Sequence, residues 1–508
     1  MSRPFTAAWL ANDASATRFL ARGFADPDAR RAAVDRAAPI RPEVLEALRA
    51  QESARPSSPS RLAALDALGR GAAAVVTGQQ VGLFLGPLYS LHKAAAAVVD
   101  ARALEVETGR PVVPVFWLQT EDHDFAEVRS AVVPGTHGLV EVACADDGRR
   151  VPMSERTFGV DDDPAALVRA LALGGPHAAE TEALLLRHYR VGASWADAFA
   201  GVLAELFADH GLVILDPRKM SPLAREIHRF AWREAARIET ALGQRSAELA
   251  AAGFTVQVGV RTGATLSCLD QGGARHRLMR DADPRDVSAA LELAPERFTT
   301  TALLRPLLQD QWLPTAAYVG GPGELAYFAE LAPLYALADM HPPLAVPRAR
   351  FQLVGATARR LAEQLGLAVD DAHLPRPELE ARLARNALPE AIHDALRATL
   401  DHGLAELARD AAARGDHGFD KHAKKTAEVV HGALDKLRER ARRHALEADQ
   451  LTAERLARFL AWLTPRGEPQ ERVLAFPPFA SQVGPRALVQ RLIDAAVPFD
   501  GTLRRIDL

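Results

Sequence analysis

Cysteine is scarce in this sequence. Only Cys144 and Cys268 occur among 508 residues, too few for a disulfide scaffold or for a zinc site built from cysteines alone. No apolar run reaches the roughly 18–20 residues that a membrane span needs, and the N-terminus lacks the basic-then-apolar pattern of a secretory signal. We therefore expect a protein of the reducing cytoplasm that does not contact a membrane.

The sequence also has no large excess of acidic or basic residues. The 65 acidic and 61 basic residues give a net charge of −4, so a general nucleic-acid-binding surface is not expected. Lysine is rare, and Lys93 is the only lysine before Lys219. With 48% hydrophobic and 25% charged residues, the composition is that of a globular protein, and the length allows two to four domains.

A rhythm of strands and helices follows an N-terminal helical segment. Apolar runs predict buried strands at 72–77, 112–118, 212–216 and 313–319, and a helix over 89–107 lies between the first two. A strand, a helix and a strand in succession form a βαβ unit, whose sheet should be parallel. Ligands of such sheets bind at the carboxyl ends of the strands, where the polar motifs of this chain lie.

The stretch of about 135–290 interrupts this rhythm and is interpreted as inserted connecting segments. An antiparallel excursion is expected over 135–160, and a hairpin is expected to pair 254–260 with 264–269. Helices are expected between them, at about 164–172, 178–190, 194–209 and 221–250.

The character of the chain changes after Pro347. From about 376 to 463 apolar residues recur every three or four positions, and the turn at Arg414–Gly418 would join two long helices as an antiparallel hairpin. Pro389 predicts a kink or break. Two interpretations stay open: an internal helical bundle, or a coiled-coil arm through which two copies form a homodimer. The expected domains are a helical segment (1–60), a core (61–350) with the inserted segments, a helical arm (351–465) and a C-terminal segment that returns to the core (466–508).

The first polar motif is TGQQVGLFLGPLYSLHK, residues 77–93. Its glycines allow a ligand to approach the backbone closely, and the helix that follows directs free N–H groups toward an anion. The pattern is neither a Walker A motif nor a GxGxxG fingerprint, so an anion-binding loop and a plain tight turn both remain open. The candidate binding residues are Gly78, Gln79, Gln80, Gly82, Phe84, Gly86, Pro87 and Tyr89, and Lys93 is a candidate for chemistry.

The second motif follows the strand at 112–118. Trp117 precedes the run Glu121, Asp122, His123 and Asp124. Carboxylates beside an imidazole can bind an amine, ligate a metal or move protons, although adjacent side chains cannot all face one substrate. The alternative is a solvated cluster of acids. No second histidine-rich motif supports a metal, so no metal site is predicted.

The third motif joins the segment 304–310 to another turn of strand, glycines and helix at 314–327. Either it forms the opposite wall of a site or it only closes a strand. The candidate binding residues are Arg305, Gln309, Tyr318, Gly320, Gly321, Glu324 and Tyr327.

These motifs together resemble the BshC family. The segments that carry the resemblance are TGQQVGLFLGPLYSLHKA (77–94), VPVFWLQTEDHDFAEV (113–128), GLVILDP (211–217), LLRPLLQDQWLPTAAYVGGPGELAYF (303–328) and PQER (469–472). The resemblance implies a Rossmann-like parallel-sheet core related to class I cysteine-activating ligases, with a coiled-coil dimerisation domain. His92 and the TTTA segment at 299–302 depart from the family pattern, and His92 is given no catalytic role.

The resemblance also implies a reaction. The family adds L-cysteine to glucosaminyl malate to form bacillithiol, and ATP would activate the cysteine carboxylate as an acyl-adenylate or an acyl-phosphate. Lys93 and the 78–86 loop would bind an anionic group, and the 121–124 cluster would hold the cysteine ammonium or accept a proton. Two rivals stay open: a ligase with another amine acceptor, and a non-catalytic, nucleotide-binding dimeric scaffold.

Overall fold

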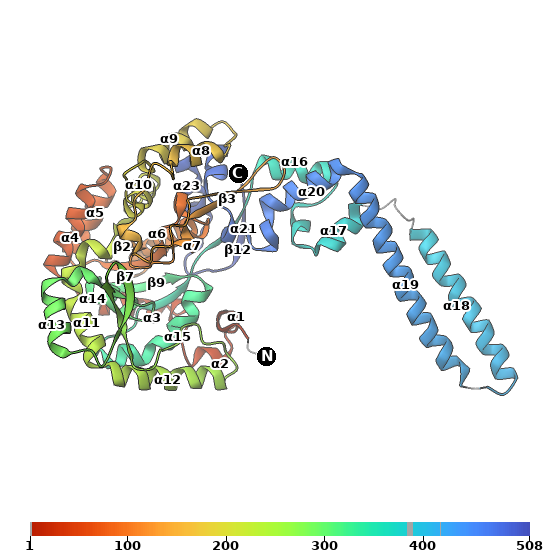
Figure 1. Ribbon diagram of the computed structural model, residues 1–508, viewed down its shortest axis with the longest axis horizontal. Coiled ribbons are helices and arrows are strands. Elements are labelled where there is room, and N and C mark those ends of the chain that lie inside the picture. Colours follow the sequence, from red (N-terminus) through yellow and green to blue (C-terminus); the bar gives the residue numbers. More distant parts are fainter. Residues whose placement is uncertain (1–2, 384–389, 417) are drawn as a thin grey trace. The chain divides into compact units, whose positions relative to one another are not determined.

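The computed structural model describes residues 3–383, 390–416 and 418–508 (Figure 1). The chain forms two compact units. The first consists of residues 1–133, 140–353 and 471–508, and the second of residues 134–139 and 354–470. Among the described residues, no helix combines the length and the apolar character needed to cross a membrane.

The first unit is built on a five-stranded parallel sheet. Its strands are β1 (Ala73–Gln80), β2 (Val112–Gln119), β5 (Val213–Leu215), β9 (Thr315–Gly320) and β10 (Leu344–Pro347). They lie in the order β10-β9-β1-β2-β5, with every neighbouring pair parallel. Numbered along the chain, this is the order 3-2-1-4-5 of doubly wound Rossmann-like folds, and the direction of winding reverses between β1 and β9. The prediction of a Rossmann-like parallel sheet is confirmed.

The βαβ unit forms because its two strands are mostly apolar and its helix buries one side against them. Strands β1 and β2 are buried along almost their whole length, and the connecting helix α6 (Tyr89–Thr108) packs against both of them. Strand β1 extends three residues beyond its predicted end, because Gly78 stays in the ladder opposite Trp117. A Cβ at Gly78 would lie 2.8 Å from the Trp117 carbonyl oxygen, so the close pairing needs glycine.

A three-stranded sheet stands in the inserted part of this unit. It contains β6 (Ala264–Gln271), β7 (Ala274–Met279) and β8 (Phe298–Thr300), with both pairs antiparallel. The predicted hairpin between 254–260 and 264–269 is wrong, because β6 turns back into β7 instead. Gly272 and Gly273 make that turn with φ of 66° and 80°, a conformation that two glycines adopt without strain.

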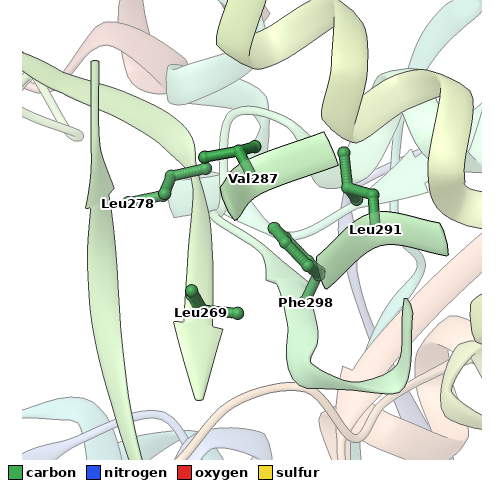
Figure 2. Close-up of a cluster of buried hydrophobic side chains, with 5 residues drawn as sticks. All are labelled: Leu269, Leu278, Val287, Leu291 and Phe298. Atoms are coloured by element: carbon green, nitrogen blue, oxygen red, sulfur yellow. The ribbon is translucent and has the colours of Figure 1, made fainter. Parts of the chain in front are cut away.

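One face of this sheet packs on a small apolar core. Leu269 and Leu278 of the hairpin meet Val287 and Leu291 of helix α13 (Pro284–Leu293), and Phe298 closes the cluster (Figure 2). This core fixes the hairpin, so residues on its opposite face hold defined positions.

The remaining elements of the first unit are mostly helices. At the N-terminus they are α1 (Phe5–Leu10), α2 (Ala14–Thr17), α3 (Pro27–Arg36), α4 (Pro42–Ser53) and α5 (Pro59–Gly69). The middle holds α7 (Phe125–Val128), β3 (Ser130–Pro134), β4 (Leu139–Ala143), α8 (Pro164–Ala170), α9 (Ala178–His188), α10 (Trp195–Leu206), α11 (Arg225–Arg233), α12 (Ala235–Ala251), α14 (Arg305–Trp312) and α15 (Pro322–Leu337). The last are β11 (Arg350–Val354), α21 (Gln470–Val473), α22 (Pro477–Val483), α23 (Pro485–Ala495) and β12 (Leu503–Asp507).

The second unit is helical. Its helices are α16 (Ala356–Leu365), α17 (Arg376–Leu383), α18 (Glu390–Ala413), α19 (Phe419–Ala448) and α20 (Gln450–Leu463). Helices α18 and α19 run side by side (Figure 1). They are antiparallel, because His393 of α18 contacts Asp435 of α19, whereas Asp401, later in α18, contacts His431, earlier in α19. The predicted long helices are therefore present; Pro389 and one residue of the predicted 414–418 turn lie outside the described residues.

Candidate functional site

A cavity of about 490 Å³ opens at the carboxyl ends of β1, β2 and β9. It lies where the winding of the sheet reverses, which is the usual ligand site of doubly wound folds. The start of α15 and the β6–β7 hairpin complete its wall. Ten of the predicted site residues line it: Gln79, Tyr89, Lys93, Trp117, Glu121, Asp122, Arg305, Gly321, Glu324 and Tyr327. The other eleven do not: Gly78, Gln80, Gly82, Phe84, Gly86, Pro87, His123, Asp124, Gln309, Tyr318 and Gly320.

Lys93 is buried on α6 and its ammonium is fully used by the protein. Nζ donates to the Gly78 carbonyl and to Gln79 Oε1, both at 2.8 Å, and forms an ion pair with Glu324. Burial lowers the pKa of Lys93, and Glu324 opposes this shift. Three donors thus meet three acceptors, so Lys93 holds the end of β1 to the first turn of α15 and has no N–H left for a ligand.

Glu324 completes this buried network. Its carboxylate accepts the Tyr318 hydroxyl at 2.6 Å and the Gly321 N–H at 2.8 Å. Burial alone would raise the pKa of Glu324, but Lys93 and these two donors hold the pKa below its ordinary value. Tyr318 therefore supports the site although it does not line the cavity.

Arg305 brings a positive charge to the cavity wall without a matching carboxylate. Its guanidinium donates to Gln309 Oε1 at 3.0 Å and to the hydroxyls of Tyr327 and Tyr318 at 2.8 and 3.2 Å. Within the described part of the chain, no carboxylate forms an ion pair with it, although only 6% of the residue is exposed. A buried charge held only by neutral partners favours an anionic ligand at this wall.

Asp122 supplies negative charge on the facing side. Its carboxylate accepts Gln80 Nε2 at 2.9 Å and the His123 N–H at 2.8 Å, and Arg275 lies 3.7 Å away. Burial would raise the pKa of Asp122, but these partners lower it, so the group stays ionised. Gln80 does not line the cavity, but its hydrogen bond holds the Asp122 carboxylate in position.

Glu121 is the more buried of the two acids. Its carboxylate accepts the Thr300 N–H at 3.3 Å and also the Thr300 hydroxyl. Burial raises the pKa of Glu121, with only partial compensation from Thr300 and from Arg218. An ionised carboxylate beside a carboxyl group whose pKa is raised is suited to hold a cation and to exchange a proton.

The other two members of the cluster turn away from the cavity. His123 lies between two arginines, with Nε2 2.9 Å from Arg150 and Nδ1 3.2 Å from Arg275. Burial and these arginines lower the pKa of His123, so its ring is neutral. Asp124 accepts the Glu127 N–H at 3.3 Å and caps α7.

The glycine-rich loop closes on itself rather than on the large cavity. A Cβ at Gly82 would lie 2.9 Å from the Gly86 Cα, and Phe84 is buried with φ of 50°. The Tyr189 hydroxyl accepts the Leu85 N–H at 3.2 Å, which fastens the loop from outside. Gly82, Gly86 and Pro87 line only a cavity of about 20 Å³, so the geometry is that of the tight turn left open above.

Several lining residues were missed from the sequence. They are Gln119, Glu127, Arg275, Arg277, Thr300, Thr301, Ala302, Pro322, Gly323, Arg348 and Arg472. Arg348 follows the carboxyl end of β10, and its guanidinium is 3.0 Å from Glu471, so the strand-end rule could have found it. Arg472 lies in the PQER segment, which the sequence had already singled out. No sequence pattern predicts that Arg275 and Arg277 of β7 lie at the carboxyl edge of the parallel sheet.

Metal ligands do not gather in the part of the chain that the structure describes. No group of three or more histidine, cysteine, aspartate or glutamate side chains there could hold a metal ion. The two free cysteines, Cys144 and Cys268, are both buried.

Comparisons with known proteins agree with this architecture. Residues 2–349 match the family model described as the N-terminal Rossmann-like domain of bacillithiol biosynthesis BshC, and residues 351–508 match its C-terminal coiled-coil domain. A protein of Koribacter versatilis is 35% identical over 87% of this chain and 85% of its own length. Proteins of Solibacter usitatus and Heliobacterium modesticaldum are 33% and 31% identical, over 89% and 84% of this chain and 87% and 81% of their own lengths. All three carry the name "Putative cysteine ligase BshC".

Proposed function

The chain belongs to the bacillithiol biosynthesis BshC family, and from this membership we propose that it is a cysteine ligase of that pathway. In the reaction we propose, the carboxyl group of L-cysteine is joined to the amine of glucosaminyl malate to give bacillithiol. The observation that carries the proposal is one cavity with an acidic side and a cationic side, placed where the sheet changes its direction of winding.

The acidic side suits the amines of the reaction. Asp122 stays ionised and can bind an ammonium group. Glu121 has a raised pKa, which brings its proton affinity closer to neutral pH and suits it to take the proton of the attacking amine. Both roles fall to residues that line the cavity, and His123 supports Asp122 through its backbone N–H and through its Nδ1, which lies 3.3 Å from the carboxylate.

The cationic side suits the anionic groups of the reaction. No carboxylate among the described residues forms an ion pair with Arg305, although Glu324 is near enough to raise the pKa of its guanidinium, and Arg472 lines the same cavity. Amide formation needs an activated carboxyl group, and ATP supplies that activation as an acyl-adenylate or an acyl-phosphate. We assign the anionic parts of ATP or of the acceptor to Arg305, Arg348 and Arg472, and we assign to Lys93 the positioning of Gln79 and Glu324.

We further propose that the enzyme is a homodimer formed through α18 and α19. Large apolar side chains are exposed on these helices, namely Ile392, Leu396, Leu407, Val429 and Leu437. A second copy would cover such a stripe, and a two-fold pair is the commonest closed assembly.

Product analysis tests the proposed reaction. The full-length protein is incubated with L-cysteine, ATP and glucosaminyl malate, with omission of ATP as the control, and products are identified by mass spectrometry. We expect bacillithiol only with ATP, together with AMP and pyrophosphate for an adenylate or ADP and phosphate for an acyl-phosphate. Product with a different amine alone would select another acceptor, and no ATP-dependent product with any amine would favour the scaffold.

A further inference from the structure

The β6–β7 hairpin presents two arginines to the cavity. Arg275 and Arg277 are two residues apart on β7, so they share one face of the strand, and both line the cavity. Leu278 points from the other face into the apolar cluster of Figure 2. The hairpin therefore holds its arginines against the site from a fixed base.

The two arginines differ in what they bind. Arg275 is engaged on all sides: Nε donates to the Thr299 hydroxyl at 2.8 Å, and another nitrogen donates to the Thr300 carbonyl at 2.6 Å. Arg277 is half-buried, and its side chain has no hydrogen bond or ion pair partner among the described residues, although its backbone pairs with Cys268 in the ladder. Its guanidinium thus has donors available to a ligand in the cavity.

A buried hydroxyl at the same wall also lacks a partner. The Thr301 side chain is 4% exposed, and no described group bonds to its Oγ1. Its backbone is satisfied, because the Thr301 N–H donates to the Leu266 carbonyl at 3.1 Å. A buried polar atom without a partner is costly, and a ligand atom in the cavity would satisfy it.

Both signs of charge meet at this end of the cavity. The Cys268 thiol interacts electrostatically with both arginines and both acids. Burial raises its pKa, Arg275 and Arg277 lower it, and Glu121 and Asp122 raise it further. A polyphosphate placed here would face two carboxyl groups. A zwitterion with an ammonium and a carboxylate on one carbon matches the pattern instead.

We propose that Arg277 and Thr301 bind the α-carboxylate of the amino-acid substrate while Asp122 binds its ammonium group. The proposal rests on the proposed function, and it adds which end of the cavity takes the amino acid. The cationic groups around Arg305 and Arg472 are then left to the nucleotide or the acceptor.

Calorimetric titration with two thiols tests this assignment. L-cysteine carries the carboxylate, and cysteamine is the same molecule without it. The wild-type protein should bind cysteine on the order of ten to a hundred times more tightly than cysteamine, the range for charge-assisted hydrogen bonds. Arg277→Gln should reduce that preference to the few-fold that Thr301 supplies, with cysteamine binding unchanged, and Arg277→Lys should retain more of it. Thr301→Val should weaken only cysteine binding, by a few-fold.

The matched control is Arg285→Gln, the same change at an exposed arginine of α13 outside the cavity, which should alter neither affinity. Melting temperatures confirm that each variant is folded. The proposal is overturned if Arg277→Gln keeps the wild-type preference, or if it weakens ATP binding and leaves cysteine binding intact. If wild-type protein makes product but its preference does not depend on Arg277, only this assignment fails. If wild-type protein neither binds cysteine nor makes product, the proposed function fails and the assignment with it.

Discussion

The buried ion pair between Lys93 and Glu324 leads to a quantitative test of stability. Lys93 is 3% exposed, and Glu324 is its only carboxylate partner among the described residues. Glu324→Gln would leave a buried ammonium without a counter-charge, which we expect to cost about 3–5 kcal/mol. Lys93→Met would leave the Glu324 carboxylate without a counter-charge, at a similar cost in the free energy of unfolding. The double variant contains neither charge, so it should lose clearly less than the two single variants together.

The pH dependence of Glu324→Gln gives a second readout. Burial lowers the pKa of Lys93, and this variant removes the carboxylate that opposes the shift. Between the lowered pKa and the ordinary value of 10.5 the unfolded chain binds a proton that the folded chain does not, so stability rises with pH. The variant should therefore recover part of its loss between pH 7 and 9.5.

Thermal melting and urea titration at both pH values measure these effects. The control is Asp420→Asn, which breaks a fully exposed ion pair with Lys424 and should leave the melting temperature unchanged. Strict additivity of the two single variants would refute the coupling, and a Glu324→Gln protein as stable as the wild type would refute the reasoning on burial.

Three further predictions follow from described contacts. Asp122→Asn should abolish turnover and keep the melting temperature within a few degrees, whereas Asp124→Asn outside the cavity should keep most turnover; equal activity of the two in the product assay would contradict the site. Burial raises the pKa of Asp100 to about 7, and its carboxylate accepts the Phe499 N–H at 2.8 Å. Because the folded protein holds that proton more tightly, stability should fall as pH rises from 5 to 8, and Asp100→Asn should flatten this dependence in melting curves. Leu437→Glu should give a mass near 54.8 kDa in light scattering with an intact core, and a wild-type mass of 54.8 kDa would contradict the dimer.

The core of the fold was readable because its signals are local. Strands β1 and β2 are continuous apolar runs, and Gly109 ends α6 with φ of 69°. Strand β10 was not predicted, because four residues next to two prolines carry too little pattern. The apolar alternation at 254–260 predicts a strand that does not form, whereas Gly272 and Gly273 make the turn of the hairpin.

The site was only partly readable for a different reason. Glu121 and Asp122 directly follow β2, so the strand-end rule brought them to the edge where the cavity opens. Arg277 lies on an inserted hairpin more than 150 positions after Asp122 and lines the same cavity. No local sequence pattern predicts this long-range contact. His123 looked like a partner of its neighbours, but only the packing of Arg150 and Arg275 decides which way its ring faces.

The bond from Lys93 to Gln79 has a consequence for recognition. A glutamine amide ordinarily offers a ligand either its oxygen or its nitrogen. Here the Lys93 ammonium donates to Gln79 Oε1, which fixes the orientation of the Gln79 amide. Its nitrogen is then directed toward the Tyr89 hydroxyl, 3.4 Å away. One hydrogen of the Gln79 amide nitrogen is given to Tyr89, and the second remains available. A ligand atom that approaches this nitrogen must be an acceptor, so an uncharged side chain favours oxygen over ammonium at that position.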